Sequence, residues 1–205
     1  MNKLEIMARI LKAVIAASGI LLLIGWVIAP TVWAKPLSYI VTIILPFVPD
    51  FFKYLGFRAS TLLVLAYEVF LVAAMVLGID LDWYKFILVT AENDSYYDKI
   101  VHFLSGILVV MAGQEFFDLY QRQSKSRQNI RWFQVLFLMG ALALVAVGWE
   151  CYEFLYDLFF DGNMQELVKS GVSDTMWDMI VSLIGGGIGI ACVIWAQGDK
   201  TIDKK

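Results

Sequence analysis

The run AVIAASGILLLIGWVIA at residues 13–29 contains 17 residues without a charged side chain. A helix rises about 1.5 Å per residue, so this run and its flanks reach the roughly 20 residues that cross the hydrocarbon core of a bilayer. Five further segments of similar character follow. The sequence therefore predicts an all-α, polytopic membrane protein with about six transmembrane helices. The predicted spans are residues 8–29, 37–54, 60–79, 100–119, 132–155 and 177–197.

Composition supports a membrane location. Of the 205 residues, 60% are hydrophobic and 17% are charged, against about 45–50% and about 25% in soluble chains. The mean hydropathy is +0.72. A soluble fold could not hide this much apolar surface from water, so the lipid bilayer is the expected partner. The net charge of −3 lacks the basic excess that nucleic-acid binding requires. Because no repeat or linker stands out, we predict a single domain over residues 1–205.

Two of the predicted spans need a closer reading. Residues 37–54 contain Pro46 and Pro49, so this helix is expected to be kinked, tilted or only partly inserted. Residues 32–34, Val-Trp-Ala, resemble a signal-peptidase site. The apolar run before them is longer than the roughly 7–15 residues of a signal peptide core, so we expect the first helix to be retained.

The basic residues predict the orientation of the spans. With the N-terminus inside, twelve Lys and Arg residues fall on the cytoplasmic side and four on the other side, as the positive-inside rule requires. Both termini are therefore predicted to be cytoplasmic. The twelve are Lys3, Arg9, Lys12, Lys53, Arg58, Arg122, Lys125, Arg127, Arg131, Lys200, Lys204 and Lys205, and the four are Lys35, Lys85, Lys99 and Lys169.

Seven polar residues gather near the ends of three predicted spans. Within each helix they are spaced three or four apart, which places them on one helix face. The fourth and sixth helices begin on the extracytoplasmic side and the fifth ends there, so all seven are expected at one depth. They are Asp98 and His102 in the fourth helix, Glu150, Glu153 and Asp157 in the fifth, and Asp174 and Asp178 in the sixth.

These residues predict a divalent-metal site. Six carboxylates cannot all stay ionised in a low-dielectric cleft unless a cation neutralises them. Oxygen ligands suit Mg²⁺, Ca²⁺ or Mn²⁺, and a direct bond from His102 would favour Zn²⁺ or Fe²⁺. Facing helices of a bundle build metal sites from such pairs. Two alternatives remain open, which are a metal-free proton or cation pathway and carboxylates solvated at helix ends. In the second alternative Asp174 caps a helix, Asp98 lies in a first turn and Asp157 lies in water.

Two further features lie away from this cluster. Glu68 lies within the third predicted span, where a carboxyl needs a partner or a proton. Gly185 and Gly189 form a GxxxG spacing, which packs either within the chain or as the face of a homo-oligomer. Cys151 and Cys192 lie in apolar runs, and they give no disulfide framework.

Three short motifs carry a family resemblance. They are Tyr97-Asp98-Lys99-Ile-Val-His102-Phe-Leu-Ser-Gly106, Trp149-Glu150-Cys-Tyr-Glu153-Phe and Asp174-Thr175-Met-Trp-Asp178-Met179. Together they resemble the YjdF-like family of bacterial inner-membrane proteins, over residues 60–195. The first motif is also similar to VanZ-like membrane proteins. The resemblance implies a compact bundle in the bacterial inner membrane and gives weight to Asp98, His102, Glu150, Glu153, Asp174 and Asp178. It brings no established activity.

The leading functional hypothesis is a metal-binding cleft that opens to the extracytoplasmic leaflet. At headgroup level its natural substrate is a lipid or a lipid-linked envelope precursor, with His102 or Glu150 as general base. Whether the protein is an enzyme stays open. One alternative is a proton- or cation-coupled transporter or channel that uses Glu68 and Gln114. Another is a non-catalytic membrane scaffold or sensor.

Overall fold

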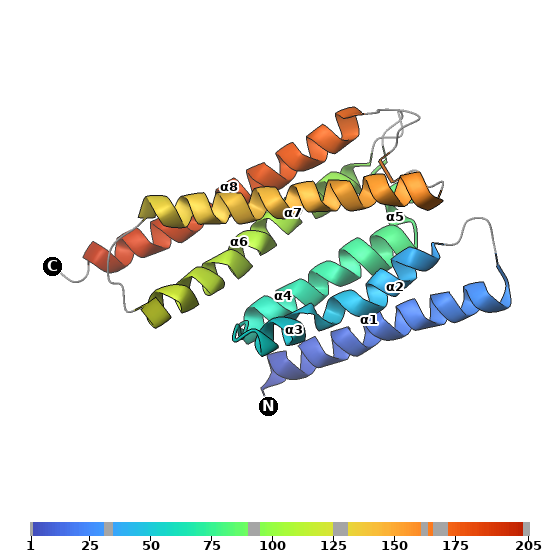
Figure 1. The fold of residues 1–205 in the computed structure, drawn as a ribbon, viewed down its shortest axis with the longest axis horizontal. Helices are drawn as coiled ribbons and strands as arrows, with labels where there is room; N and C mark the ends of the chain where they lie inside the picture. Colours follow the sequence, from blue (N-terminus) through green and yellow to red (C-terminus); the bar gives the residue numbers. More distant parts are fainter. Residues whose placement is uncertain are drawn as a thin grey trace. The chain divides into compact units, whose positions relative to one another are not determined.

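The computed structural model describes residues 2–30, 35–89, 95–124, 131–160, 164–165 and 172–202, and these residues are almost entirely helical (Figure 1). Their β-structure is limited to an isolated bridge between Val89 and Ser95. The helical elements are α1 (Lys3–Ile28), α2 (Pro36–Ile44), the 3₁₀ turn η1 (Leu45–Phe47), α3 (Val48–Tyr54), α4 (Thr61–Leu71), the π-helix η2 (Val72–Asp80), α5 (Trp83–Phe86), α6 (Tyr96–Ser124), α7 (Arg131–Phe160) and α8 (Val172–Ile202).

Six stretches of these helices are long and apolar enough to cross a membrane, which confirms the predicted fold class. Each overlaps one predicted span. The six are Lys3–Ile28, Pro36–Tyr54, Thr61–Asp80, Tyr96–Gln123, Arg131–Phe160 and Val172–Gln197.

The distribution of polar and apolar side chains is the one expected in lipid. Large aliphatic side chains point outward, including Leu21 at 69% exposure and Leu144 at 74%. Polar side chains such as Ser38, Thr42 and Glu68 are fully buried. Water would penalise this arrangement, whereas a bilayer favours it, because polar groups are sheltered from hydrocarbon and apolar groups meet it.

The chain forms two compact units, Met1–Val101 and His102–Lys205, whose boundary falls inside α6. We refer to them as unit 1 and unit 2. The prediction of a single domain is not tested by this division. Residues 32–34, which resemble a signal-peptidase site, lie outside the described part of the chain.

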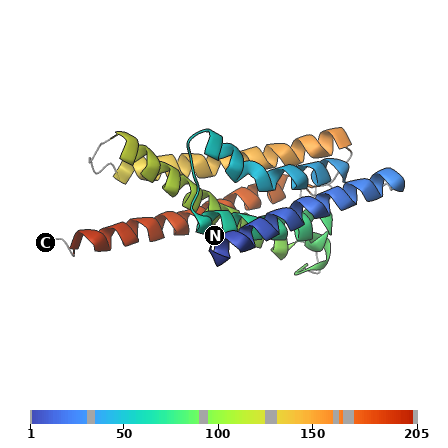
Figure 2. The same cartoon turned by 90° about the horizontal axis from the view of Figure 1, so that it is seen from below.

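In unit 1, α1 lies alongside α2 and also packs on α4 (Figures 1 and 2). The second span is built from three pieces, and a proline stands in the first turn of each, namely Pro36, Pro46 and Pro49. Proline lacks the N–H that continues an α-helix, which explains the change to a 3₁₀ turn at Pro46. The predicted interruption of this span is therefore present.

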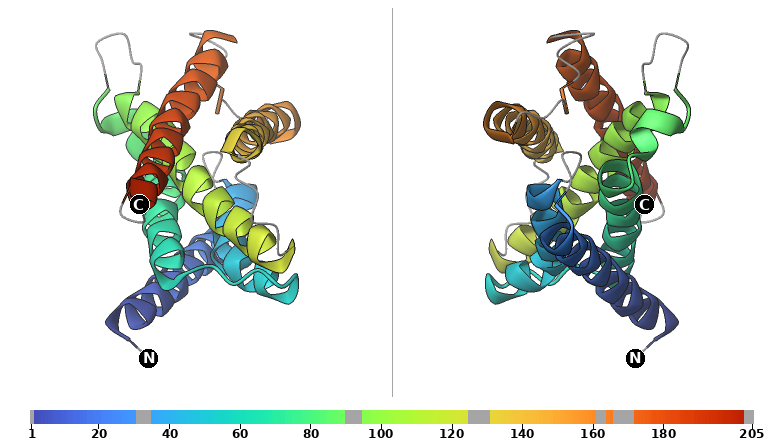
Figure 3. Two further views of the ribbon diagram at one scale, coloured as in Figure 1. Left: turned by 90° about the vertical axis from the view of Figure 1, so that its left-hand side faces the viewer. Right: turned by 90° about the vertical axis from the view of Figure 1, so that its right-hand side faces the viewer.

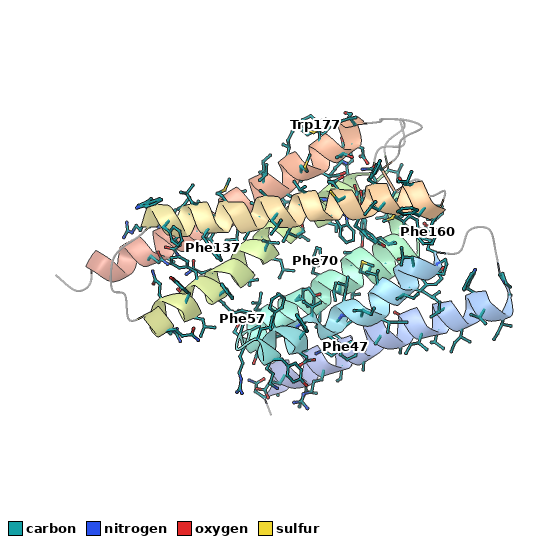
Figure 4. The ribbon with its side chains drawn as sticks, in the orientation of Figure 1. Phe47, Phe57, Phe70, Phe137, Phe160 and Trp177 are labelled. Atoms are coloured by element: carbon teal, nitrogen blue, oxygen red, sulfur yellow. The ribbon has the colours of Figure 1, made fainter. Side chains whose placement is uncertain are left out.

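The third span changes its helix type as well. The α-helix α4 continues as the π-helix η2, which ends at Asp80. A π-helical stretch is rare and often marks a functional site. The sequence analysis did not predict it. The residues of unit 1 labelled in Figure 4 are Phe47, Phe57 and Phe70.

In unit 2, α7 runs in the opposite direction to α6 and α8 (Figures 1 and 3). The beginning of α8 and the end of α7 therefore lie at the same end of the unit, where Trp177 and Phe160 are labelled in Figure 4. At the other end, the aromatic ring of Phe137 stacks on Phe116, at 6.0 Å between ring centroids. The core of the unit contains Val110, Leu138 and Ile190, one from each helix. This direction of the helices brings together the three helix ends that carry the predicted site.

Candidate metal site

Helices α6 and α8 cross at a pair of glycines (Figure 3). A Cβ atom added to Gly106 would lie 2.1 Å from the carbonyl oxygen of Ser182, and one added to Gly185 would lie 2.1 Å from that of Phe103. No larger residue fits such a backbone contact, so the two glycines permit this crossing. Gly189 packs on Val110. The GxxxG face is thus occupied within the chain, and its predicted role in a homo-oligomer gains no support.

A serine hydroxyl group of α8 connects the two helices one turn before Gly106. The carbonyl oxygen of His102 accepts a hydrogen bond from Ser182 Oγ of α8 at 3.1 Å. It also accepts one from Ser105 Oγ at 2.7 Å. The bond from Ser182 fixes the register of α6 against α8 at His102, whose imidazole belongs to the candidate site.

The imidazole of His102 faces the carboxylate of Asp178. Their side chains are almost fully buried, and His102 Nε2 lies 3.9 Å from Asp178 Oδ1. This distance exceeds that of a hydrogen bond. Asp98 lies four residues before His102 on α6 and is half-buried. Each of these three residues offers a ligand atom, and the three atoms lie within 4.8 Å of one another.

This donor set fits a divalent cation. A metal bound at about 2.0–2.2 Å from nitrogen or oxygen holds its ligands about 3–4 Å apart. Two carboxylates and one imidazole match the borderline ions Zn²⁺ and Fe²⁺ better than Ca²⁺, which prefers oxygen alone. Lys99 Nζ lies 3.5 Å from Asp98 Oδ2, so an arriving cation competes with an ammonium group at that carboxylate.

The other predicted ligands lie outside this group of three. On α7, Glu150 and Glu153 are buried, and Glu153 Oε1 accepts a hydrogen bond from Trp149 Nε1 at 2.7 Å. Asp174 is half-buried in the first turn of α8. Because α8 begins at Val172, Asp174 lies inside the helix, beyond the position of an N-cap.

Asp157 has a structural role. Its carboxylate accepts hydrogen bonds from the backbone N–H groups of Met164, at 2.7 Å, and Gln165, at 2.9 Å. Gln165 is buried, and its side-chain amide donates to Thr175 Oγ1 at 3.3 Å and to the carbonyl oxygen of Glu150 at 3.5 Å. Sequence reasoning missed Gln165, because it belongs to no apolar or charged pattern. Its chain position after α7 offered no signal.

Unit 1 contains a polar network that the sequence analysis also missed. Asp80 Oδ1 accepts a hydrogen bond from Ser38 Oγ at 2.7 Å, and Asp80 Oδ2 accepts one from Thr42 Oγ1 at 2.8 Å. All three residues are buried. The available signal was the spacing of Ser38 and Thr42, which places two hydroxyls on one face of an apolar helix.

A second part of this network lies just outside the membrane-spanning segments. Lys35 Nζ lies 2.6 Å from Asp82 Oδ1, and Lys85 Nζ lies 3.0 Å from the same oxygen. Burial lowers the pKa of Lys35, and the hydrogen bond and charge of Asp82 partly offset this effect. For Asp82, burial acts to raise the pKa, but the hydrogen bonds and charges of Lys35 and Lys85 outweigh it and lower the pKa.

Comparison with known proteins gives one match. The model of a family described as "Predicted membrane protein (DUF2238)" matches residues 7–199. Neither a curated protein nor a solved structure matches the chain. The narrower resemblances to YjdF-like and VanZ-like proteins stay predictions.

Proposed function

The chain belongs to the DUF2238 family of predicted membrane proteins, and on this premise we propose that it binds a divalent cation where α6 and α8 meet. The single observation that carries the proposal is the grouping of Asp98, His102 and Asp178, whose ligand atoms lie within 4.8 Å of one another. Buried ionisable groups inside a membrane span are costly, so they are retained where they serve a function. A divalent cation would neutralise the negative charges of both carboxylates.

The proposed reaction class follows from the depth of the site. Asp98 lies in the first turn of α6, at the beginning of a candidate span, and a span is expected to begin near the lipid headgroups. We propose a lipid or lipid-linked envelope precursor as the substrate, with the site open to the extracytoplasmic leaflet of the bacterial inner membrane. A bound divalent cation would supply polarisation of a phosphoryl or carbonyl oxygen.

The residues around the proposed cation site have different proposed roles. Asp178 and Asp98 supply oxygen ligands, and His102 supplies nitrogen. When its lone pair is engaged in this way, His102 cannot accept a proton, so Glu150 on α7 becomes the general base. If His102 is not a ligand, its imidazole takes that role. Ser105 and Ser182 act as positioning residues, because they hold the backbone of His102.

Metal content tests the cation site. We expect the purified protein to contain one divalent metal per chain by elemental mass spectrometry. Asp178→Asn and His102→Ala should each weaken binding about tenfold or more. Absence of metal from the wild type, even after reloading with Zn²⁺, Fe²⁺, Mn²⁺ and Mg²⁺, would overturn the proposal.

Two matched variants locate the site more finely. Asp118→Asn removes a carboxylate from the same helix α6, where Asp118 Oδ1 accepts a hydrogen bond from Gln114, and should leave metal binding unchanged. Asp157→Asn should also retain the metal, because both oxygens of Asp157 already bind backbone N–H groups. Loss of metal in Asp157→Asn would indicate a larger site that includes α7.

The substrate class needs a separate test. We expect membranes from cells that lack the protein to accumulate a lipid or lipid-linked precursor, and we expect Asp178→Asn to fail to reverse this change. Lipid extracts are compared by mass spectrometry between wild-type, deletion and variant strains. Identical lipid and envelope-precursor profiles in all three would contradict a role in lipid chemistry while leaving the metal site intact.

A further inference from the structure

Glu68 on α4 is a buried carboxyl group that the candidate metal site does not use. Its side chain has 0% exposure. Neither Oε1 nor Oε2 has a hydrogen-bond partner among the residues that the structure describes. The residue lies within the membrane-spanning stretch Thr61–Asp80, about 10 Å along the helix from Thr61 at about 1.5 Å per residue. Lipid around unit 1 excludes water from it further.

The same unit shows how hydroxyl donors satisfy a buried carboxyl group. Asp80 is also buried, but hydroxyl groups of Ser38 and Thr42 donate to its two oxygens. Glu68 has no such donors in the described residues. An ionised carboxylate without donors in a low-dielectric interior costs several kcal/mol, whereas the protonated form carries no charge. The packing of unit 1 therefore favours a Glu68 that holds a proton.

One ion pair of unit 1 acts electrostatically on Glu68. Lys12 Nζ of α1 forms an ion pair with Asp50 Oδ2 of α3 at 2.5 Å. Both groups act electrostatically on Glu68. The side chain of Lys12 is 18% exposed and that of Asp50 is 53% exposed. Lys12 and Asp50 thus supply a partly buried ammonium and a more exposed carboxylate whose charges reach Glu68.

Among the described residues, the titratable groups around Glu68 are few. The elements that pack on α4 are α1, η1 and η2. From α1 the facing charge is Lys12, η1 contains no titratable residue, and η2 carries only Asp80, twelve residues further along the chain. The neighbouring Tyr67 donates its hydroxyl to the carbonyl oxygen of Leu45 at 2.8 Å. The cluster therefore depends on Glu68, Lys12 and Asp50.

We propose that Glu68 is a reversible proton-binding site in the interior of unit 1 and that the Lys12–Asp50 ion pair connects it with the aqueous surface. The proton passes from the Glu68 carboxyl group to the Asp50 carboxylate, which then releases it to water. Lys12 keeps its positive charge throughout. This charge offsets the negative charge of Asp50 before the transfer and that of Glu68 after it. The net charge of the three residues is unchanged until Asp50 releases its proton.

The ligand is a proton rather than a metal ion. A metal requires several donor atoms around it, whereas Glu68 offers one carboxyl group beside an ammonium that repels cations. Among the described residues, the group of three ligand atoms suited to a metal lies elsewhere, at Asp98, His102 and Asp178. The two sites are therefore independent, and Glu68→Gln should leave metal content unchanged.

Dicyclohexylcarbodiimide tests the proposal, because it is an apolar reagent that modifies protonated carboxyl groups. The full-length protein in lipid nanodiscs is treated over a range of pH values, and the modified residue is mapped by mass spectrometry. We expect modification at Glu68, with a rate that falls as the pH rises. Asp80, buried but hydrogen-bonded, is the internal control and should remain unmodified. The mapping needs no variant, so the result does not depend on the folding of one.

Variants then test the route. In Glu68→Gln the modification should disappear and the protein should remain folded, because the neutral amide replaces a neutral carboxyl of the same shape. Asp50→Asn should slow the exchange of the Glu68 proton, which is measured by infrared spectroscopy of the carboxyl C=O stretch. The carbodiimide should still modify Glu68 in this variant at low pH. An unmodified Glu68 at every pH, or modification of Asp80 to the same extent, would overturn the proposal. Exchange unaffected by Asp50→Asn would overturn the route.

Discussion

At the scale of single residues, Asp80 is a buried carboxyl group whose two oxygens both have hydrogen-bond donors. Two hydroxyl groups, Ser38 Oγ and Thr42 Oγ1, donate to its two oxygens from the neighbouring helix α2. The three side chains form a polar connection between α2 and η2, both of which belong to unit 1. In lipid such a connection holds helices together where the hydrophobic effect between them is absent.

Removing this carboxylate should destabilise the protein. Asp80→Ala leaves the two buried hydroxyl groups without their acceptor. Each hydroxyl can instead donate to a backbone carbonyl one turn earlier in its helix, so we expect a loss of stability of about 1–3 kcal/mol in total. Ser38→Ala removes only one of the two bonds and should cost less. Thermal unfolding in detergent, followed by circular dichroism, gives the ranking. A larger loss in Ser38→Ala than in Asp80→Ala would contradict this account.

The ion pairs of Asp82 should make the stability of the folded protein depend on pH. Its pKa is lower in the folded protein than in the unfolded chain, because the hydrogen bonds and charges of Lys35 and Lys85 outweigh burial. A carboxyl with a lowered pKa stabilises the fold above its unfolded pKa of about 3.9, and the contribution is lost as the pH falls through the folded value. The midpoint of thermal unfolding should therefore differ between wild type and Asp82→Asn near neutral pH and converge in acid. A constant difference at all pH values would argue against this ion pair.

At the scale of elements, the crossing of α6 and α8 depends on backbone contact. Gly106 and Gly185 leave no room for a Cβ atom, since each added atom would lie 2.1 Å from a carbonyl oxygen of the other helix. His102 lies one turn before Gly106, Asp178 one turn before Ser182, and Asp98 about two turns before Gly106. Any displacement of the helices therefore separates His102 from Asp178. The geometry of the site is a consequence of the crossing.

Two glycines of α8 provide a matched test. Gly185→Ala forces the helices apart and should cost about 1–3 kcal/mol, as overpacked cores do. Gly187→Ala adds a Cβ atom with nothing within 4 Å and should gain up to about 1 kcal/mol from helix propensity. Unfolding midpoints and metal content are measured for both. Equal behaviour of the two variants would contradict the proposed crossing, and loss of metal only in Gly185→Ala would link the crossing to the site.

At the scale of the whole molecule, the six spans and the distribution of basic residues determine the expected topology. Where all six candidate spans cross the membrane, both termini lie on one side of it. The excess of Lys and Arg on that side predicts that it is the cytoplasm. The candidate metal site, at the beginning of α6, then faces the opposite side. The site open to the extracytoplasmic leaflet that we propose depends on this orientation.

Reporter fusions test the topology in cells. A fluorescent protein fused after Lys205 should fluoresce, because it folds in the cytoplasm, and alkaline phosphatase fused there should be inactive. The same reporters inserted between Val89 and Ser95 should give the reverse result. An active phosphatase at the C-terminus would invert the orientation and would move the candidate site to the cytoplasmic leaflet.

Much of the architecture could be predicted from hydropathy alone. The six spans, their approximate limits and the interruption at Pro46 follow from local rules, because each transmembrane helix satisfies its own backbone hydrogen bonds. Helical periodicity and the direction of each span predicted one depth for seven polar residues, and the structure groups the ligand atoms of three of them, Asp98, His102 and Asp178. Gln165 and the π-helix η2 were not foreseen, because neither leaves a periodic signal.

The sequence by itself therefore determined the helical class and the approximate limits of six spans long and apolar enough to cross a membrane, and it predicted a depth for each charged group. Only the tertiary structure decided which of those groups meet. Depth depends on the position of a residue along one helix, but contact depends on how two helices rotate and approach. That approach is set by long-range packing, as at Gly106 and Gly185. For the same reason Asp80 acquires two hydrogen-bond donors and Glu68 acquires none in the described part of the chain, although both are carboxyl groups buried in the same span.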